Sequence, residues 1–396
     1  MKITRIETIR LAEHPRLLWV QVHTDSGLVG LGETFYVPGA VAAVVHDVAA
    51  PVLLGEDPLD IERHWHALFH ITNYYGYAGA EMRAVSALDI ALWDIAGQAA
   101  GQPVYNLLGG RVRERIWTYN TCASYGDCDD YTAFHERAGE LAESLLGEGI
   151  TAMKIWPFDR FAAAERPVAD TRLSQHVPLD YYSVGPHITP EQVKLGLRSV
   201  EEIRRAVGDR MEIAIELHAR WNLPSAIRIA KALEPYDVMW FEEALTPDPV
   251  DDLGRLVQET RVPICVSERL FTRYAFRQVL ERKAAHIVMP DIIWTGGVSE
   301  GKKIAAMAEA YHLPIAPHDC TGPVNVFACL HLCASCPNAM VMESVRAFYR
   351  GYYDDIVETN LDVRGGHIHF PTAPGIGTRL RSSVRERSDA SVQVSG

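Results

Sequence analysis

Apolar positions in the first part of the chain change from an alternating to a helical spacing. The first 35 residues form three short runs typical of antiparallel strands, and Thr24-Asp25-Ser26-Gly27 predicts the turn between residues 18–23 and 28–33. From residue 41 to about residue 100, apolar side chains recur at helical spacing, which predicts three helices before the break at Gly101-Gln102-Pro103. We therefore expect an α+β domain over residues 1–115.

Beyond residue 115, short β-rich runs alternate with stretches compatible with helices. The runs are residues 116–121, 152–155, 212–215, 238–241, 262–266, 286–289, 313–316 and 339–342. Strands that alternate with helices favour a parallel sheet, and eight of them over about 240 residues favour a closed barrel over an open sheet. The predicted fold class is α/β, with a (β/α)8-type barrel (a modified TIM barrel) over residues 116–354 and an N-terminal α+β capping domain.

Two segments fall outside this alternation. The connection at residues 157–189 is rich in Asp, Pro and Tyr, and its length is typical of a lid or a surface excursion near an active site. The polar residues 383–396 predict a disordered tail.

The composition excludes several classes of protein. Among the 396 residues, 38 are basic and 51 acidic, and the net charge of −13 argues against a nucleic-acid partner. The N-terminus lacks the apolar core of a signal peptide, and polar residues interrupt the most apolar stretch, residues 41–54, so we expect no membrane span. Seven scattered cysteines without a zinc-site spacing are typical of reduced thiols, and we expect a cytoplasmic protein.

From the second predicted barrel strand onward, each strand ends at or near an ionisable residue. The C-terminal ends of barrel strands converge, and active sites form there. Because side chains alternate along a strand, Trp156 shares the inward face of Lys154 and offers an apolar wall beside a cation. The ionisable residues are Lys154, Glu216, Glu242, Glu268, Asp291, His318 and Glu343.

Three consecutive strands end in glutamates at a constant spacing of 26 residues, namely Glu216, Glu242 and Glu268. Carboxylates gathered in this way raise one another's pKa by repulsion unless a cation lies among them. An all-oxygen donor set favours Mg²⁺. The sequence therefore predicts a magnesium site with open coordination positions for a substrate carboxylate and hydroxyl.

Two histidines are candidates for proton transfer at this site. His218 faces the same way as Glu216, because the two residues are two positions apart on one strand. Asp291 and His318 end neighbouring strands, where a carboxylate can hold an imidazole in one tautomer and raise its basicity. We expect His318 to act as a base that Asp291 orients.

The sequence resembles the enolase superfamily, in its mandelate racemase-like branch, over about residues 1–380. The resemblance rests on Ala87-Leu88-Asp89-Ile90-Ala91-Leu92-Trp93-Asp94, Leu107-Leu108-Gly109-Gly110, Met153-Lys154, Glu216, Trp240-Phe241-Glu242-Glu243, Ser267-Glu268-Arg269, Asp291, Thr295-Gly296-Gly297 and Pro317-His318. It implies that the N-terminal domain, completed by about residues 355–382, closes over the barrel. It also implies that the three acids bind Mg²⁺ and that the His–Asp pair is a base, in a superfamily whose sites stabilise an ene-diolate.

Departures from the superfamily pattern narrow the expected activity. Racemase-like and cycloisomerase-like members carry Lys-X-Lys on the second strand, where this chain has Lys154-Ile155-Trp156. Enolase-like and cycloisomerase-type members have a lysine at the end of the sixth strand, where this chain has Asp291. Glu216-Leu217-His218 is instead similar to the Asp-X-His pattern of galactonate dehydratase-type sugar-acid dehydratases, with Glu in place of Asp.

The expected activity is dehydration of an aldonate-like sugar acid to a 2-keto-3-deoxy acid. His318 would remove the α-proton and His218 would protonate the departing β-hydroxyl. Lys154 and a protonated Glu343 would stabilise the developing charge, with Ser344 or Arg346 as alternatives to Glu343. A sugar-acid epimerase, racemase or cycloisomerase remains open because it shares the early steps, and a non-catalytic binding barrel is a more distant alternative.

Substrate specificity is expected to reside mainly in the cap. The expected partner is a small-molecule acid sugar, and relatives suggest a homo-oligomer, from a dimer to an octamer. The candidate substrate contacts are Trp156, His14, Arg16, Tyr36, Tyr74 and Tyr75, with Tyr181 and Tyr182 in the long connection.

Overall fold

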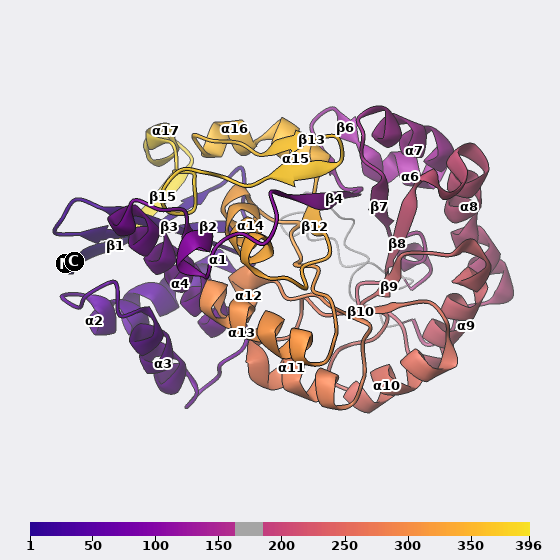
Figure 1. Cartoon of the computed structure of the whole chain (residues 1–396), viewed down its shortest axis with the longest axis horizontal. Helices are drawn as coiled ribbons and strands as arrows, with labels where there is room; N and C mark the ends of the chain where they lie inside the picture. The colour runs from indigo at the N-terminus through magenta and orange to yellow at the C-terminus, as the bar shows by residue number, and fades with distance from the viewer. Residues whose placement is uncertain (163–184) are drawn as a thin grey trace.

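The chain forms two lobes that lie side by side in Figure 1. The computed structural model describes residues 1–162 and 185–396. The indigo and violet N-terminal lobe lies at the left, and the ring of strands and helices at the right runs from β4 (Arg115–Thr121) to β12 (Met342–Ser344). Tyr181, Tyr182 and much of the expected lid lie outside the described residues.

The N-terminal lobe is an antiparallel sheet covered by helices. Strands β1 (Ile3–Leu11), β2 (Leu17–Thr24) and β3 (Val29–Phe35) pair in sequence order, as the alternating pattern predicts. Three helical segments follow, which also agrees with the prediction. They are α1 (Pro38–Ala43) continuing through a π-helical stretch (Val44–Ala49) into α2 (Ala50–Leu53), then α3 (Ile61–Thr72), and then α4 (Ala80–Ala100).

Two glycines allow α4 to pack closely on β3. A Cβ atom at Gly30 would lie 2.0 Å from the carbonyl oxygen of Ala91, and one at Gly32 would lie 1.8 Å from that of Ala87. Any larger residue would therefore push the helix away from the sheet. This contact places the start of α4, which carries Arg83, against the end of β3.

Parallel strands close the predicted barrel. In the described residues β4 pairs with β7 (Ala152–Ile155), and β8 (Glu212–Glu216), β9 (Trp240–Glu242), β10 (Ile264–Val266) and β11 (Ile287–Val288) follow in order. Single-residue bridges join Ile315 to Val288 and to Ala339, and β12 pairs back onto β4. The fold class is confirmed, and the predicted seventh strand is reduced to one bridged residue.

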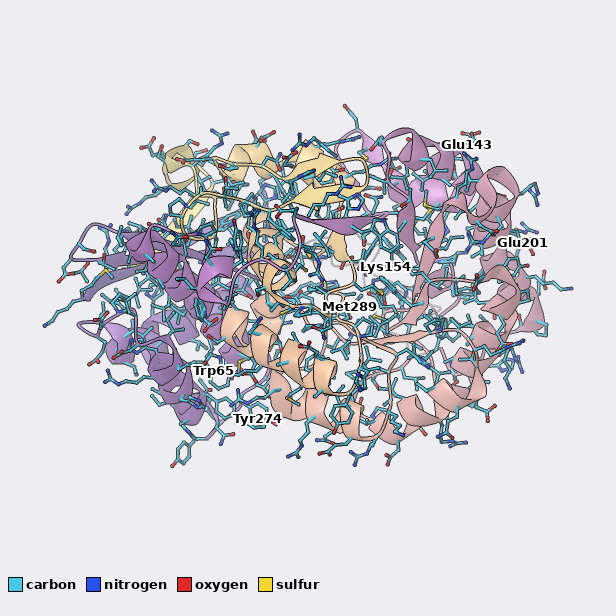
Figure 2. The ribbon with its side chains drawn as sticks, viewed as in Figure 1. Trp65, Glu143, Lys154, Glu201, Tyr274 and Met289 are labelled. Carbon is cyan, nitrogen blue, oxygen red and sulfur yellow. The ribbon has the colours of Figure 1, made fainter. Side chains whose placement is uncertain are left out.

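Helices surround the barrel, and inward side chains fill it. Trp240 and Met289 are fully buried in its interior. Figure 2 shows Lys154 and Met289 inside the ring, with Glu143 and Glu201 on the outer helices. The surrounding helices are α6 (Asp130–Glu136), α7 (Ala138–Gly147), α8 (Pro190–Val207), α9 (Leu223–Leu233), α10 (Val250–Glu259), α11 (Thr272–Glu281), α12 (Ile292–Thr295), α13 (Gly297–Ala310) and α14 (Pro323–Ser335).

Shorter elements complete the description. None of the helices in the described part of the chain has the length and apolar character needed to cross a membrane. Short 3-10 turns lie at Asp159–Phe161, Gly208–Arg210 and Glu234–Tyr236. The remaining elements up to residue 356 are α5 (Val104–Leu107), the two-stranded β5 (Ser124–Tyr125) and β6 (Cys128–Asp129), α15 (Arg346–Gly351) and α16 (Tyr353–Ile356).

The C-terminal segment corrects one sequence prediction and adds to another. Residues 383–396 are not a disordered tail, because β15 (Ala390–Ser395) follows α17 (Ser382–Glu386) and pairs antiparallel with β1. The segment expected to complete the cap also serves the barrel, since β13 (Asp362–Arg364) and β14 (His367–His369) form a hairpin on β4. Backbone hydrogen bonding to a distant strand edge gives these polar residues their order.

Buried carboxylates hold the two lobes together. Glu33 on β3 accepts hydrogen bonds from Trp19 Nε1 at 2.8 Å and from the N–H of Asn325, at the start of α14, at 3.1 Å. Asp89 on α4 accepts hydrogen bonds from the N–H and hydroxyl of Ser299, at the start of α13, at 3.0 and 2.6 Å. Helix N-termini favour negative charge, so these contacts fix the cap relative to the barrel helices. Burial nevertheless raises the pKa of Glu33 to about 8 and that of Asp89 to about 7.

Replacing Asp89 by asparagine should flatten the pH dependence of stability. Burial raises the pKa of Asp89 to about 7, against about 4 in an unfolded chain. The folded protein thus holds a proton that the unfolded chain releases, so this group's stabilising contribution is lost as pH rises through that window. Between about pH 5 and pH 8, the free energy of unfolding of the wild type should therefore fall by roughly 2 kcal/mol more than that of Asp89→Asn.

Urea unfolding at the two pH values measures this difference. The exposed Asp127→Asn variant is the matched control and should follow the wild type. Parallel pH profiles for Asp89→Asn and the wild type would contradict the raised pKa of Asp89.

Candidate active site

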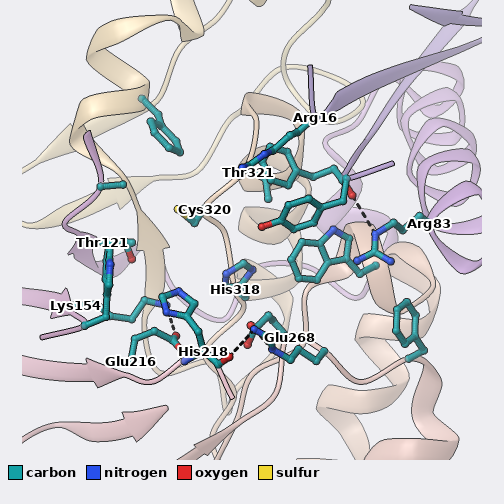
Figure 3. A pocket seen from close by; sticks show the side chains of 18 residues that line it. Arg16, Arg83, Thr121, Lys154, Glu216, His218, Glu268, His318, Cys320 and Thr321 are labelled. Atoms are coloured by element: carbon teal, nitrogen blue, oxygen red, sulfur yellow. Dashed lines mark hydrogen bonds and ion pairs between the residues drawn. The ribbon is translucent and has the colours of Figure 1, made fainter. Parts of the chain in front are cut away.

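A cavity of about 440 Å³ lies at the C-terminal ends of the barrel strands. Figure 3 shows that both lobes contribute to its walls, with Arg16 and Arg83 from the cap and Lys154, Glu216 and His318 from the barrel. Small-molecule sites occupy about 300–1,000 Å³. Four of the predicted strand-end residues therefore line a space of ligand size, namely Lys154, Glu216, Glu268 and His318.

Lys154 lies at the centre of a group of buried acids. Its Nζ is 2.5 Å from Glu242 Oε1 and 2.9 Å from Glu343 Oε1. A third acid, Glu216, approaches it at 3.6 Å through Oε2. Burial by itself would lower the pKa of the ammonium group, but the charges of Glu242 and Glu343 raise it well above its usual range. Lys154 is therefore held as a cation.

Glu216 and Glu242 face each other from neighbouring strands. Strand pairing aligns the two residues, and burial together with the charge of Glu216 raises the pKa of Glu242 well above its usual range. Burial also opposes ionisation of Glu216, yet the charge of His218 and other contacts lower its pKa. The pair thus carries a repulsion that a shared cation would relieve.

Glu268, the third predicted ligand, belongs to a second charged group at the same cavity. Arg269 Nε lies 3.4 Å from Glu268 Oε1 and 3.3 Å from Glu243 Oε2. The same guanidinium donates a hydrogen bond to the carbonyl oxygen of His218 at 3.0 Å. The Oε2 atom of Glu268 is buried and has no hydrogen-bond partner among the described residues.

The donors fit a hard divalent cation in their chemistry. They are all carboxylate oxygens, and the raised pKa of Glu242 and the unpartnered Glu268 oxygen both mark charge that the protein leaves uncompensated. Within residues 1–162 and 185–396, no three His, Cys, Asp or Glu side chains already form a metal-binding group. The structure brings Glu216 and Glu242 together and places Glu268 at the same cavity. The first two acids contact Lys154, whereas Glu268 contacts Arg269.

His318 and Asp291 form a buried pair, as the strand order predicts. His318 Nδ1 lies 2.8 Å from Asp291 Oδ2, and Oδ1 of Asp291 accepts from the N–H of Ile293 at 2.9 Å. Burial would lower the pKa of His318, but the charge of Glu343 and the hydrogen bond to Asp291 raise it to about 9. Because Asp291 engages Nδ1, Nε2 is the nitrogen that can exchange a proton at the cavity.

His218 is oriented by Asp159, a residue that no sequence pattern singled out. The two side chains lie 2.6 Å apart, between His218 Nδ1 and Asp159 Oδ2. His218 and Ala219 have positive φ values of 48° and 58°, so the backbone turns sharply where β8 ends. Burial would lower the pKa of His218, but the charges of Glu216 and Asp159 raise it. The site thus contains a second imidazole held by a carboxylate.

The surroundings of Glu343 do not favour the protonated state that the sequence analysis expected. Thr121 Oγ1 donates to its Oε1, and the N–H of Asp319 donates to its Oε2 at 2.7 Å. Burial would raise its pKa, but the charges of Lys154 and His318 lower it below its usual value. A hydrogen bond from a protonated Glu343 to substrate is therefore not supported, because its neighbours are donors and cations.

The predicted substrate contacts divide into two groups. Trp156, Arg16 and Tyr36 line the cavity, and the Trp156 ring packs edge-on to His218 with centres 5.7 Å apart. His14 lines a small neighbouring pocket instead.

Other expected contacts lie away from the cavity. Tyr74 and Tyr75 are 93% and 58% exposed and are not among the described residues that line the cavity, so the structure does not support the prediction that they contact substrate. They belong to the turn between α3 and α4, which carries them to the surface. Ser344 donates to the carbonyl of Tyr119, and Arg346 binds Asp130, so neither alternative to Glu343 is held toward the substrate.

Several site residues were missed from the sequence, for different reasons. Glu243 and Arg269 each follow a predicted metal ligand, so a charged neighbour of a strand-end acid was an available signal. Asp159 lies in a short 3-10 turn after β7, and Trp294 lies on α12, where neither has a periodic signature. Arg83 lies on a long helix and reaches the cavity only because the cap docks there.

Two family models together match most of the chain. Residues 6–109 match the mandelate racemase / muconate lactonizing enzyme N-terminal domain. Residues 137–384 match the enolase C-terminal domain-like model. The first match covers the capping strands and helices, and the second covers most of the barrel.

Named relatives and solved structures agree with these models. The chain is 32% identical to a D-galactonate dehydratase of Ralstonia nicotianae, covering 98% of this chain and 94% of the relative. It is 30% identical to a D-xylonate dehydratase of Haloferax volcanii, covering 96% and 87%. The chain also resembles a crystal structure of an enolase of the mandelate racemase subgroup from Agrobacterium tumefaciens, with a succinimide residue, sodium and phosphate. The two sequences are 45% identical, the match covers 100% of this chain and 99% of that chain, and the structures superpose with a TM-score of 0.88. The chain therefore belongs to the enolase superfamily, in its mandelate racemase / muconate lactonizing enzyme branch.

Proposed function

We propose that this protein is a Mg²⁺-dependent dehydratase that converts an aldonate-like sugar acid to a 2-keto-3-deoxy acid. The observation that carries the proposal is two imidazole–carboxylate pairs, His318–Asp291 and His218–Asp159, whose histidines both line the one cavity. The names of the relatives, D-galactonate and D-xylonate dehydratases, support the same reaction class. Cytoplasmic localisation and a homo-oligomeric state stay predictions.

The acids at the barrel mouth would hold the cation. Glu216, Glu242 and Glu268 are the proposed ligands, and bound Mg²⁺ would supply Lewis-acid polarisation of the substrate carboxylate. Lys154 keeps a positive charge beside two of these acids, at 2.5 Å from Glu242 and 3.6 Å from Glu216. Its charge favours the negative charge that develops on the substrate when the α-proton leaves.

His318 is the proposed base. Asp291 holds Nδ1–H, so Nε2 takes the α-proton of the substrate. The charges of Glu343 and Asp291 raise the basicity of this nitrogen and stabilise the imidazolium that forms. Asp291 therefore acts through His318, as a positioning residue.

His218 is the proposed acid. Asp159 engages its Nδ1, so the proton for the departing β-hydroxyl would come from Nε2. Elimination breaks the α C–H bond and the β C–O bond, and it forms a double bond and one water molecule. The resulting enol then tautomerises to the 2-keto-3-deoxy acid.

The difference between the two imidazoles favours elimination over racemisation. Racemisation at one carbon needs a base on each face of that carbon, whereas elimination needs one base and one acid at adjacent carbons. His318 follows Ile315 of the barrel and is held by Asp291, while His218 follows β8 and is held by a turn after β7. Separate partners allow the two histidines to hold different protonation states.

A screen of acid sugars tests the reaction class. With Mg²⁺ present, at least one aldonate-like or related acid should yield a semicarbazide-reactive 2-keto-3-deoxy acid. Isomerisation without loss of water, seen in the ¹H spectrum in D₂O, would instead identify an epimerase or cycloisomerase. No reaction with any member of a stereochemically complete library would contradict the proposal.

Replacing each histidine by asparagine should separate the two proton transfers. His318→Asn should lower α-proton exchange with D₂O and dehydration together by about 10²–10⁴-fold, because both need the base. His218→Asn should stop dehydration by a similar factor while leaving exchange measurable. Unchanged exchange in His318→Asn would remove His318 as the base, and unchanged water loss in His218→Asn would remove His218 as the acid.

The pH profile of Asp291→Asn should reveal its effect on His318. A base must be unprotonated, so kcat/KM of the wild type should rise with pH through the pKa of His318, which Glu343 and Asp291 raise to about 9 against burial. Loss of the Asp291 charge should move this acidic limb to lower pH, toward the ordinary histidine value of about 6.5. A lower rate with an unmoved limb would show that Asp291 has only a structural role.

A further inference from the structure

Positively charged side chains outnumber negatively charged ones among the described residues that line the cavity. Its walls include four Lys and Arg side chains, of which Lys154 and Arg269 bind the barrel acids already described. Arg16 and Arg83, from the cap, form no ion pair with any carboxylate in the described part of the chain. Figure 3 shows them at the upper right of the cavity, with Lys154 and Glu216 at the left and His318 between.

Both guanidinium groups are held by aromatic rings. The guanidinium carbon of Arg16 lies 5.4 Å from the centre of the Tyr36 ring. That of Arg83 lies 4.9 Å from the Trp294 ring, and its Nε donates to the carbonyl of Phe35 at 3.0 Å. Rings that stack on a guanidinium fix its plane and leave its edge N–H groups available to an anion.

The two arginines flank the same pair of rings. Tyr36 and Trp294 lie with their centres 5.6 Å apart, so Arg16 on one ring and Arg83 on the other approach a common region. Trp294 in turn lies 5.4 Å from the ring of His318. The two arginines are therefore connected to the proposed base through the rings of Tyr36 and Trp294.

Two buried donors in this region have no partner in the part of the chain that the structure describes. The Nε of Arg16 is buried without a hydrogen-bond partner among the described residues. The indole N–H of Trp294, a residue only 6% exposed, also lacks one within residues 1–162 and 185–396. Buried donors and cations are destabilising unless a partner satisfies them, and together these groups match an anion with several acceptor oxygens.

We propose that Arg16 and Arg83 bind a second carboxylate, so that the natural substrate is a sugar diacid of the aldarate class. The inference rests on the proposed function and refines it, since an aldarate is an aldonate whose terminal hydroxymethyl group is a carboxylate. One carboxylate is placed at the barrel acids, where the α-proton is removed, and the other lies against the cap arginines. Arginine pairs with carboxylates through two parallel hydrogen bonds, which suits this end of the cavity.

The second carboxylate takes no part in bond changes. The α C–H and β C–O bonds break as before, water leaves, and the product is a 2-keto-3-deoxy diacid. The role of the arginines is to position the substrate, so that only one end of the molecule is presented to His318.

Matched pairs of acids test the proposal on the wild-type protein. Each aldarate is compared with the aldonate of the same configuration, and with that aldonate esterified by phosphate at its terminal hydroxyl. The aldarate should have a kcat/KM at least about tenfold higher than its aldonate, as expected for one charge-assisted contact. Equal values would overturn the proposal, and a preference for the phosphate ester would overturn the assignment of the anion as a carboxylate.

Variants locate the effect. Arg16→Met and Arg83→Met should each lower the ratio of kcat/KM for the aldarate to kcat/KM for the aldonate by about 10–100-fold. Arg255→Met, at a side chain 69% exposed on α10, is the matched control and should leave both unchanged. Arg83→Lys, which keeps a charge without the planar fork, should fall between the wild type and Arg83→Met. Equal losses for aldarate and aldonate would overturn the assignment.

Binding separates this proposal from the proposed function. Calorimetry of the same acids with His318→Asn in Mg²⁺ needs no turnover, and aldarates should bind at least about tenfold more tightly than aldonates. If the wild type dehydrates no acid, yet aldarates bind more tightly than aldonates in an arginine-dependent manner, the diacid site is supported and the dehydratase function is contradicted. If aldonates and aldarates bind equally tightly and are dehydrated equally fast, the dehydratase function is supported and the diacid site is contradicted.

Discussion

The burial of several carboxylates at the mouth of one barrel is the constraint on which the site depends. Like charges in a buried space raise one another's pKa or must be balanced by cations. Here Lys154 balances Glu242 and Glu343, while Arg269 balances Glu243 and Glu268. The balance is incomplete, because burial and the charge of Glu216 still raise the pKa of Glu242. A divalent cation among these oxygens would remove the remaining repulsion.

The same electrostatics acts on the two histidines. His318 is buried and His218 partly buried, which opposes the charge of each imidazole, and each is held by a carboxylate through Nδ1. Asp291 comes from the strand next to His318, whereas Asp159 reaches His218 from a turn after β7. Against burial, neighbouring carboxylates raise the pKa of both imidazoles: Glu343 and Asp291 act on His318, and Glu216 and Asp159 act on His218.

The cap contributes the part of the cavity that the barrel chemistry does not supply. Asp89 on α4 binds the start of α13, and Glu33 on β3 binds the start of α14. The cap is thereby fixed on the helices that follow the Asp291 and His318 strand ends. Arg16 and Arg83 therefore reach the cavity from a firmly placed surface, and selection of the substrate can be separated from removal of its proton.

The sequence by itself determined the barrel, the strand-end acids and the His318–Asp291 pair, because strand alternation and parallel pairing follow from local periodicity. To predict that the regularly spaced acids lie at one end of the barrel, it was enough to know that the C-terminal ends of barrel strands converge. Tertiary structure alone decided that β15 orders the tail on β1, that Tyr74 and Tyr75 face solvent, that Asp159 holds His218, and that Arg83 lines the cavity. These features depend on contacts between residues far apart in the chain, and neither periodicity nor residue type records which distant surface a turn or helix will meet.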